Sequence, residues 1–207
     1  MSVKIDHKTL WQSYGKFFII ALAIALVGYG AWQYKLHRQA VFVEEASLQY
    51  DKMLTALRTK DFTKVEEQFK IIQEKYQATP YASLAALIQA RVDVEQNAMD
   101  KAIAHLQTAV NVAEQQQGPM GHVARVRLAR LLADQKKYDE ALNLLTANVK
   151  TDGYITLYEE AKGDIYSQKN DLDKARDAYA VALKAVPPGV SANALQLKMT
   201  DLKNREE

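Results

Sequence analysis

The sequence predicts an all-α protein with one membrane-spanning helix near its N-terminus, a solenoid of helical hairpins behind it, and a C-terminal capping helix. Three observations support this fold class. Residues 17–34 carry no charge, apolar residues recur at helical spacing from about residue 40 onward, and the later part of the chain repeats with a period of 34 residues. Only four prolines and eight glycines interrupt the 207 residues, and no segment has the alternation of a convincing strand.

Residues 17–34 have the length and composition of a membrane-spanning helix. The run begins at Phe17 and ends with Trp32 and Tyr34, and aromatic rings are common at the headgroup layers of a membrane. At about 1.5 Å per residue the run extends about 27 Å, close to the about 30 Å of a hydrocarbon core. A cleaved signal peptide fits the same template. Because the apolar character continues through Trp32 and Tyr34 without a polar segment, we expect the span to be retained as an anchor.

The charges on the two sides of the span predict its orientation. Lys4, Lys8 and Lys16 precede it, whereas Lys35 and Arg38 follow it, so the positive-inside count is three against two. A short leading tail before a large domain is also how a single-span signal anchor is built. We therefore expect a single-pass protein of a bacterial inner membrane, with the N-terminus in the cytoplasm and the bulk of the chain in the periplasm.

The remaining chain divides into helices at clusters of glycine, proline, asparagine and paired polar residues. Residues 1–16 are the predicted cytoplasmic tail. Nothing that breaks a helix lies between Trp32 and Lys60, so the span is expected to continue through residues 35–60 into the first hairpin, before a repeat domain at 61–207. The expected helices cover residues 38–59, 62–76, 81–96, 99–115, 121–135, 138–149, 154–168, 172–185 and 191–204.

Two adjacent hairpins in this series match each other position by position at a displacement of 34 residues. This is the period of tetratricopeptide repeats, in which a small residue of the first helix lets the second helix pack closely. The alternative is an unrelated helical bundle with accidental periodicity. The matched pairs are Leu128 and Lys162, Ala129 and Gly163, Leu132 and Tyr166, Tyr138 and Leu172, Ala141 and Ala175, and Leu145 and Tyr179.

Earlier hairpins follow the same pattern more loosely. The small or β-branched residues that we expect at the hairpin pivot are Val65, Ala102, Ala141 and Ala175, which are 37, 39 and 34 residues apart. A solenoid also needs a polar cap at its free end. Residues 191–204 are expected to form it, with Ser191 as the N-cap, and Leu195, Met199 and Leu202 are expected to cover Tyr179 and Leu183.

Composition argues against several classes of function. Without the five Lys and Arg and the one Asp of residues 1–38, the chain has 22 basic and 24 acidic residues, so no basic block is available for nucleic acid. The absence of cysteine excludes disulfides, cysteine-ligated zinc and thiol catalysis. No nucleophile, phosphate loop or metal-ligand spacing occurs, so we expect no enzymatic activity, no cofactor and no metal. Asp93 and Glu95 are expected to be surface charges, and residues 115–117 a solvated helix end.

The inner face of the solenoid is the predicted binding surface. In such arrays the first helix of each hairpin lines this face, and here it combines apolar side chains with three arginines, a mixture that suits an extended peptide or partner segment. The alternative is that the apolar members simply belong to the core. The predicted partner-binding residues are Leu84, Leu87, Ile88, Arg91, Val94, Val126, Arg127 and Arg130, and the face continues with Val123, Leu157, Glu160 and Asp164.

Taken together, several features resemble the YfgM family of proteobacterial inner-membrane proteins. They are the uncharged span, the Trp32-Gln33-Tyr34 stretch at its end, the 127–130 and 162–164 segments, and the weak tetratricopeptide units. The resemblance implies an ancillary subunit of the SecYEG translocon, anchored with its repeats in the periplasm. It also implies association with the membrane-bound chaperone PpiD and transfer of newly translocated proteins to periplasmic chaperones.

The predicted function is therefore that of a membrane-anchored adaptor of the secretion machinery. A scaffold for envelope or outer-membrane assembly, or for cell-division coordination, is the first alternative, although such proteins are often soluble or lipidated. The second alternative is a binding module for a small ligand or peptidoglycan fragment, which would need a pocket with converging polar groups. The sequence does not specify an oligomeric state.

Overall fold

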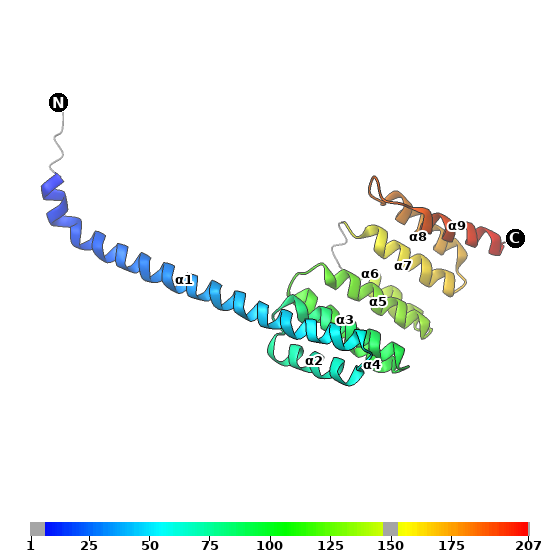
Figure 1. Ribbon diagram of the computed structural model, residues 1–207. Coiled ribbons are helices and arrows are strands. Elements are labelled where there is room, and N and C mark those ends of the chain that lie inside the picture. Colours follow the sequence, from blue (N-terminus) through cyan, green and yellow to red (C-terminus); the bar gives the residue numbers. More distant parts are fainter. Residues whose placement is uncertain (1–6, 147–152, 207) are drawn as a thin grey trace, which may run out of the picture. The chain divides into compact units, whose positions relative to one another are not determined.

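The computed structural model describes residues 7–146 and 153–206, and within these ranges the protein is entirely helical (Figure 1). This confirms the predicted all-α class, and the predicted helix bounds agree with the observed ones to within two residues wherever both are described. The end of the predicted helix 138–149 and the first six residues of the predicted tail lie outside the described residues. The helices are α1 (His7–Arg58), α2 (Phe62–Lys75), α3 (Pro80–Glu95), α4 (Met99–Gln115), α5 (Met120–Asp134), α6 (Tyr138–Thr146), α7 (Ile155–Gln168), α8 (Leu172–Lys184) and α9 (Asn193–Glu206).

The chain forms two compact units, Met1–Leu48 and Gln49–Glu207. In the first unit α1 carries the apolar run, and the side chains of Phe17, Trp32 and Tyr34 are exposed. By length and composition, α1 is the one described helix that is long and apolar enough to cross a membrane. It runs without a break from His7 to Arg58, so where the span ends and the first hairpin begins within this helix stays a prediction.

The second unit is a row of antiparallel hairpins closed by a single helix. The pairs α3 and α4, α5 and α6, and α7 and α8 pack against each other, while α3 contacts α5 and α5 contacts α7. The first helices of successive hairpins therefore lie side by side (Figure 1). α9 packs on α8 and buries Leu195 and Leu202 beside Tyr179, which confirms the predicted capping helix.

All four turns inside the hairpins have the same construction. Lys60, Asn97, Lys136 and Asn170 adopt positive φ angles of 55°, 58°, 61° and 65°. The next residue donates its N–H to a carbonyl five positions earlier, as in the bond of 2.9 Å from Asp171 N to Tyr166 O, which is the Schellman arrangement. The turns recur at intervals of 37, 39 and 34 residues, the same intervals as the predicted pivots, so each hairpin is a copy of one unit.

The pivot residues Val65, Ala102, Ala141 and Ala175 are all fully buried. Twelve positions before the last pivot stands Gly163, where an added methyl group would overlap the ring of Tyr179. The predicted role of the small residue is therefore confirmed in α7 and α8, because only glycine admits a tyrosine ring at this distance. α9 begins two residues later than predicted, and the Ser191 hydroxyl accepts a hydrogen bond of 3.3 Å from the Asn193 N–H.

Candidate partner-binding face

The predicted partner-binding residues lie on α3 and α5, two neighbouring first helices of the hairpins. Arg91, Val94 and Arg127 are exposed, and Leu84, Ile88 and Arg130 are half-buried. We refer to these six residues as the inner face.

Leu87 and Val126 must be removed from the predicted set. They are only 6% and 2% exposed and belong to the core, as the alternative interpretation held. A helix buries a stripe of at least 100°. In α3 and α5, each packed against helices on several sides, that stripe takes in apolar positions which the spacing alone assigned to the surface.

The inner-face arginines differ in how far they are already engaged. Arg91 Nε donates to Glu95 Oε1 over 3.0 Å in an exposed pair on the same helix. Exposed pairs of this kind contribute little and exchange readily with other partners. Arg91 and Arg127 therefore offer guanidinium groups at the surface.

Arg130, in contrast, belongs to a ladder of charges that runs from hairpin to hairpin. Arg130, Asp164 and Lys198 are successive residues at the 34-residue period, on α5, α7 and α9. Arg130 Nη2 lies 3.1 Å from Asp164 Oδ2, and Lys198 Nζ lies 2.6 Å from Asp164 Oδ1. Lys198 Nζ also lies 2.7 Å from Glu160 Oε1. The ladder joins the last two hairpins to the cap.

Asp164 also accepts a hydrogen bond of 2.8 Å from the hydroxyl of Tyr179 on α8. Burial of the phenol, followed by this bond to a carboxylate, raises the pKa of Tyr179 above its ordinary value of 10.0. Asp164 therefore holds three donors from three helices. The predicted face ends here in a structural cluster rather than in free side chains.

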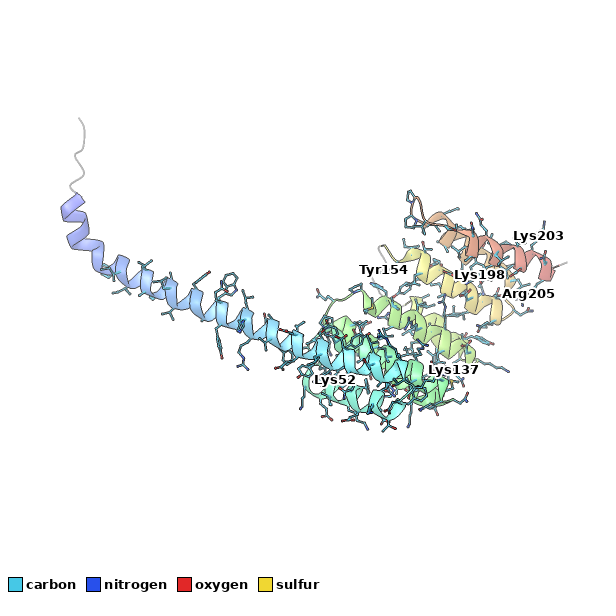
Figure 2. The ribbon with its side chains drawn as sticks, in the orientation of Figure 1. Lys52, Lys137, Tyr154, Lys198, Lys203 and Arg205 are labelled. Carbon is cyan, nitrogen blue, oxygen red and sulfur yellow. The ribbon has the colours of Figure 1, made fainter. Side chains whose placement is uncertain are left out.

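A cavity of about 490 Å³ opens beside this ladder. Its charged lining alternates in sign, with Arg130, Lys198 and Arg205 against Asp134, Asp164 and Asp201. Arg205 spans α9 to α7 through a bond of 2.7 Å to Ser167 Oγ, and Figure 2 shows it with Lys198 on α9. The charges compensate one another locally, which suits a structural joint between α7 and α9.

Two polar groups that the sequence placed at the surface are inside the domain. Asp93, predicted as a surface charge, is only 2% exposed, and His105 Nδ1 lies 2.5 Å from its Oδ2. Gln116, in the predicted solvated helix end, donates to the carbonyls of Gln77 and Thr79 at 3.0 and 2.8 Å. The Gln116 amide thereby closes the turn between α2 and α3.

His122 also has partners that the sequence did not suggest. Its ring stacks on Tyr154 with a centroid separation of 4.0 Å, and its Nδ1 lies 3.0 Å from the Tyr158 hydroxyl. Burial lowers the pKa of His122. The available signal was the position of each histidine across from a polar or aromatic residue in the facing helix, which becomes visible only once the hairpins are paired.

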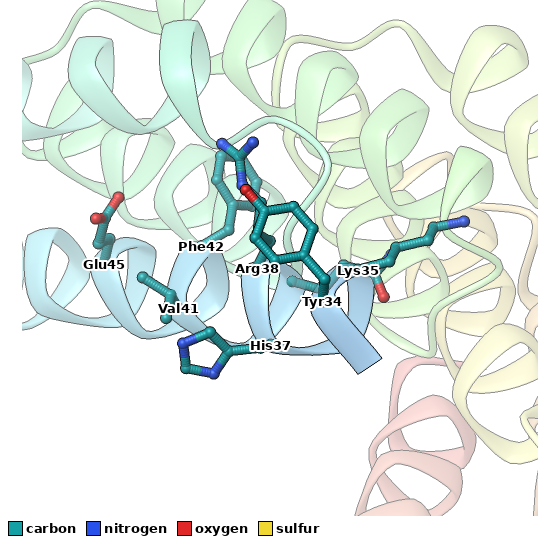
Figure 3. Close-up of a pocket in the computed structure, with 8 residues that line it drawn as sticks. Tyr34, Lys35, His37, Arg38, Val41, Phe42 and Glu45 are labelled. Atoms are coloured by element: carbon teal, nitrogen blue, oxygen red, sulfur yellow. The ribbon is translucent and has the colours of Figure 1, made fainter. Parts of the chain in front are cut away.

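In the first unit, a hollow of about 620 Å³ follows the surface of α1 just beyond the apolar run (Figure 3). It is lined by Tyr34, Lys35, His37, Arg38 and neighbouring residues of the same helix up to Glu45. An aromatic ring followed by basic side chains is the usual composition at the edge of a membrane-spanning helix. This stretch therefore fits the end of an anchor.

In the part of the chain that the structure describes, no three His, Asp or Glu side chains are grouped so that they could hold a metal ion. The functional content of the described residues is thus a surface and a small number of polar cavities.

Comparison with known proteins agrees with this architecture. The chain is 28% identical over 200 residues to the ancillary SecYEG translocon subunit of Neisseria gonorrhoeae, covering 96% of this chain and 94% of that one. It is 29% identical over 187 residues to the ancillary SecYEG translocon subunit of Escherichia coli, covering 88% of each chain. These relatives confirm the predicted resemblance to the YfgM family, and with the single apolar helix they fit a single-pass membrane protein. The family described as tetratricopeptide repeat-like domain matches residues 8–204, and the chain therefore belongs to this family.

Proposed function

We propose that this protein is a membrane-anchored, non-catalytic adaptor of the SecYEG translocon that links it to periplasmic chaperones, including a PpiD-like membrane chaperone. The observation that carries the proposal is the similarity over nearly the whole chain to proteins named as translocon subunits. The repeat domain supports it, because tetratricopeptide-like hairpins are a scaffold for binding other polypeptides.

The inner face supplies the chemistry of recognition. Leu84, Ile88 and Val94 offer apolar contact area, while Arg91 and Arg127 offer guanidinium groups that pair with carboxylates. A partner segment that combines apolar and acidic side chains would match this surface. The flat, mixed character suits a transient protein contact rather than a tightly held small molecule.

The anchor contributes position. A domain held at the membrane meets other membrane proteins at a much higher effective concentration than a freely diffusing domain does. We therefore infer that the apolar run of α1 places the repeat domain beside the translocon, in the periplasm. The excess of three basic residues over two on the N-terminal side of the span supports this orientation.

Crosslinking in native membranes tests the partner assignment. A photoreactive amino acid at Arg91 or at Arg127 should crosslink to translocon subunits or to a membrane-bound chaperone. The matched control is Asp173, which is exposed on α8 away from the inner face, and it should give no such products. Recovery of envelope-assembly proteins from Arg91 and Arg127, without translocon or chaperone subunits, would replace the proposal with the scaffold alternative.

Orientation can be tested separately, because the chain has no cysteine of its own. A single Lys137→Cys substitution in the repeat domain should react with a membrane-impermeant maleimide once the outer membrane is opened. A single Ser2→Cys substitution in the tail should react only after the inner membrane is also dissolved. The reverse pattern would show that the repeats are cytoplasmic.

A further inference from the structure

A second polar cavity lies on the side of the domain formed by α2, α3 and α4. It has a volume of about 360 Å³ and is lined by Phe62, Glu66, Gln89, Asp93, Lys101 and His105, among others. None of these residues belongs to the inner face. This volume is within the range of small-ligand sites, about 300 to 1,000 Å³.

The floor of this cavity is a buried chain of three polar side chains. His105 Nδ1 lies 2.5 Å from Asp93 Oδ2, and Gln89 Nε2 donates to Asp93 Oδ1 over 3.2 Å. The carboxylate needs a donor on each side, so the His105 Nδ1 carries a proton and the Gln89 amide turns its nitrogen to Asp93. Flipping the Gln89 amide would place its oxygen against the carboxylate.

This arrangement leaves the carbonyl oxygen of Gln89 without a donor. Gln89 is only 4% exposed, and its Oε1 is buried and accepts no hydrogen bond from any described residue. Buried polar groups are nearly always paired. The amide is held by Asp93 in the orientation that keeps this acceptor free, so the cavity is built to receive a hydrogen-bond donor.

The rest of the lining narrows the kind of donor. Glu66 adds a carboxylate from α2, and its partner Lys70 is an exposed side chain 2.7 Å away in a surface pair. Phe62 adds an aromatic ring. The cations near the cavity, Lys70 and Lys101, are both exposed, and surface charges of this kind are well screened by water and salt.

We propose that this cavity binds a guanidinium group, either of a free compound or of an arginine side chain in a polypeptide. A guanidinium is planar, carries several N–H donors in fixed directions and stacks on aromatic rings. It can therefore donate to Gln89 Oε1 and to Glu66 while lying against Phe62. A primary ammonium is a compact, strongly hydrated charge and lacks the planar face, so it should bind more weakly.

Titration of the full-length protein in nanodiscs tests this site directly. Selective ¹⁵N labelling of the four histidines gives a signal from His105 in the cavity wall and one from His122 outside it. N-acetyl-arginine amide should shift the His105 signal in a saturable way and leave His122 unchanged, and N-acetyl-lysine amide should bind about threefold to tenfold more weakly. An unchanged His105 signal, or equal binding of the two amides, would overturn the proposal.

Two substitutions locate the binding group. Glu66→Gln should weaken arginine amide binding by about threefold to tenfold, whereas Glu67→Gln, at the next exposed position of α2 and outside the cavity lining, should leave it unchanged. Equal effects of the two would overturn the assignment. Gln89→Met should abolish binding, and because Gln89 is buried its thermal unfolding is compared with that of Glu66→Gln.

The source of the guanidinium follows from a further arm. A short arginine-containing peptide that binds more tightly than the free amide would identify a polypeptide segment, and equal affinity would identify a small compound. The cavity lies apart from the inner face, so this result and the crosslinking of Arg91 and Arg127 can fail independently.

Discussion

The hairpin of α7 and α8 and the hairpin of α3 and α4 solve the same packing problem with different pairs of side chains. Twelve positions before the pivot stands Gly163 in the former and Ala90 in the latter. Four positions after the pivot stand Tyr179 and Leu106, respectively, and all four residues are buried. The larger ring is matched by the smaller partner, so the volume at the crossing is conserved although the individual residues are not.

The two hairpins also use polar groups differently. In the last hairpin the position of the charge ladder holds Asp164, which joins three helices. The equivalent position in α3 holds Arg91, which is exposed and pairs only within its own helix. The α3 and α4 hairpin instead has its buried polar chain between Asp93 and His105. The repeats therefore share a backbone plan, while their polar contacts assign different tasks to the two ends of the domain.

The largest expected effect comes from disturbing the glycine and tyrosine pair. Gly163→Ala should lower the free energy of unfolding by about 2 to 3 kcal/mol, because the added methyl group overlaps the Tyr179 ring. Urea unfolding followed by circular dichroism measures this. The double variant Gly163→Ala with Tyr179→Leu recreates the Ala and Leu pair of α3 and α4, and it should be less destabilised than the sum of the single variants. Simple additivity would show that the two positions do not compensate each other.

The next effect separates the two ladder positions. Asp164→Ala should lower the free energy of unfolding by about 1 to 2 kcal/mol, because it leaves Arg130, Lys198 and the Tyr179 hydroxyl without their shared acceptor. Arg91→Ala at the equivalent position of α3 should change it by less than about 0.5 kcal/mol, since its pair is exposed. A loss for Arg91→Ala as large as that for Asp164→Ala would contradict the division between the ends.

A pH dependence should distinguish the same hairpin. The raised pKa of Tyr179 means that the folded state keeps the phenol proton after the unfolded chain begins to lose it near pH 10.0. Stability that is present below pH 10.0 is then lost as the pH rises, by up to about 1.4 kcal/mol per pH unit for this group. Tyr179→Phe should make the decline between pH 10 and 11 shallower. Tyr50 and Tyr158, whose pKa values are also raised by burial, account for a residual slope.

The smallest effect transfers a feature between the hairpins. Asp171 and Asp61 cap α8 and α2 by accepting from the backbone N–H of Lys174 and Lys64. The equivalent position before α4 is Ala98, whose φ and ψ of −91° and 63° are close to those of Asp171, −92° and 75°. Ala98→Asp should therefore raise the free energy of unfolding by about 0.5 to 1 kcal/mol. Thermal unfolding against Ala98→Asn and wild type checks this, and no gain from either substitution would argue against the shared turn geometry.

Much of the architecture could be predicted because it depends on local periodicity. The uncharged run of residues 17–34, the helix bounds and the intervals between Val65, Ala102, Ala141 and Ala175 are properties of neighbouring residues, and the structure repeats the same intervals in its turns. The relation between Gly163 and Tyr179 was also visible, since a small residue and a large one recur at fixed distances from the pivot.

The tertiary structure alone decided which side chains of the inner face remain accessible and which polar groups are paired. Helical spacing placed Leu87 and Val126 on one face with Arg91, but neighbouring helices on more than one side bury them. The bonds of Asp93 with His105 and of Asp164 with Arg130 and Lys198 depend on how one helix rotates against the next. Periodicity within one helix determines which face is apolar, whereas that rotation is set by the packing of all its neighbours together.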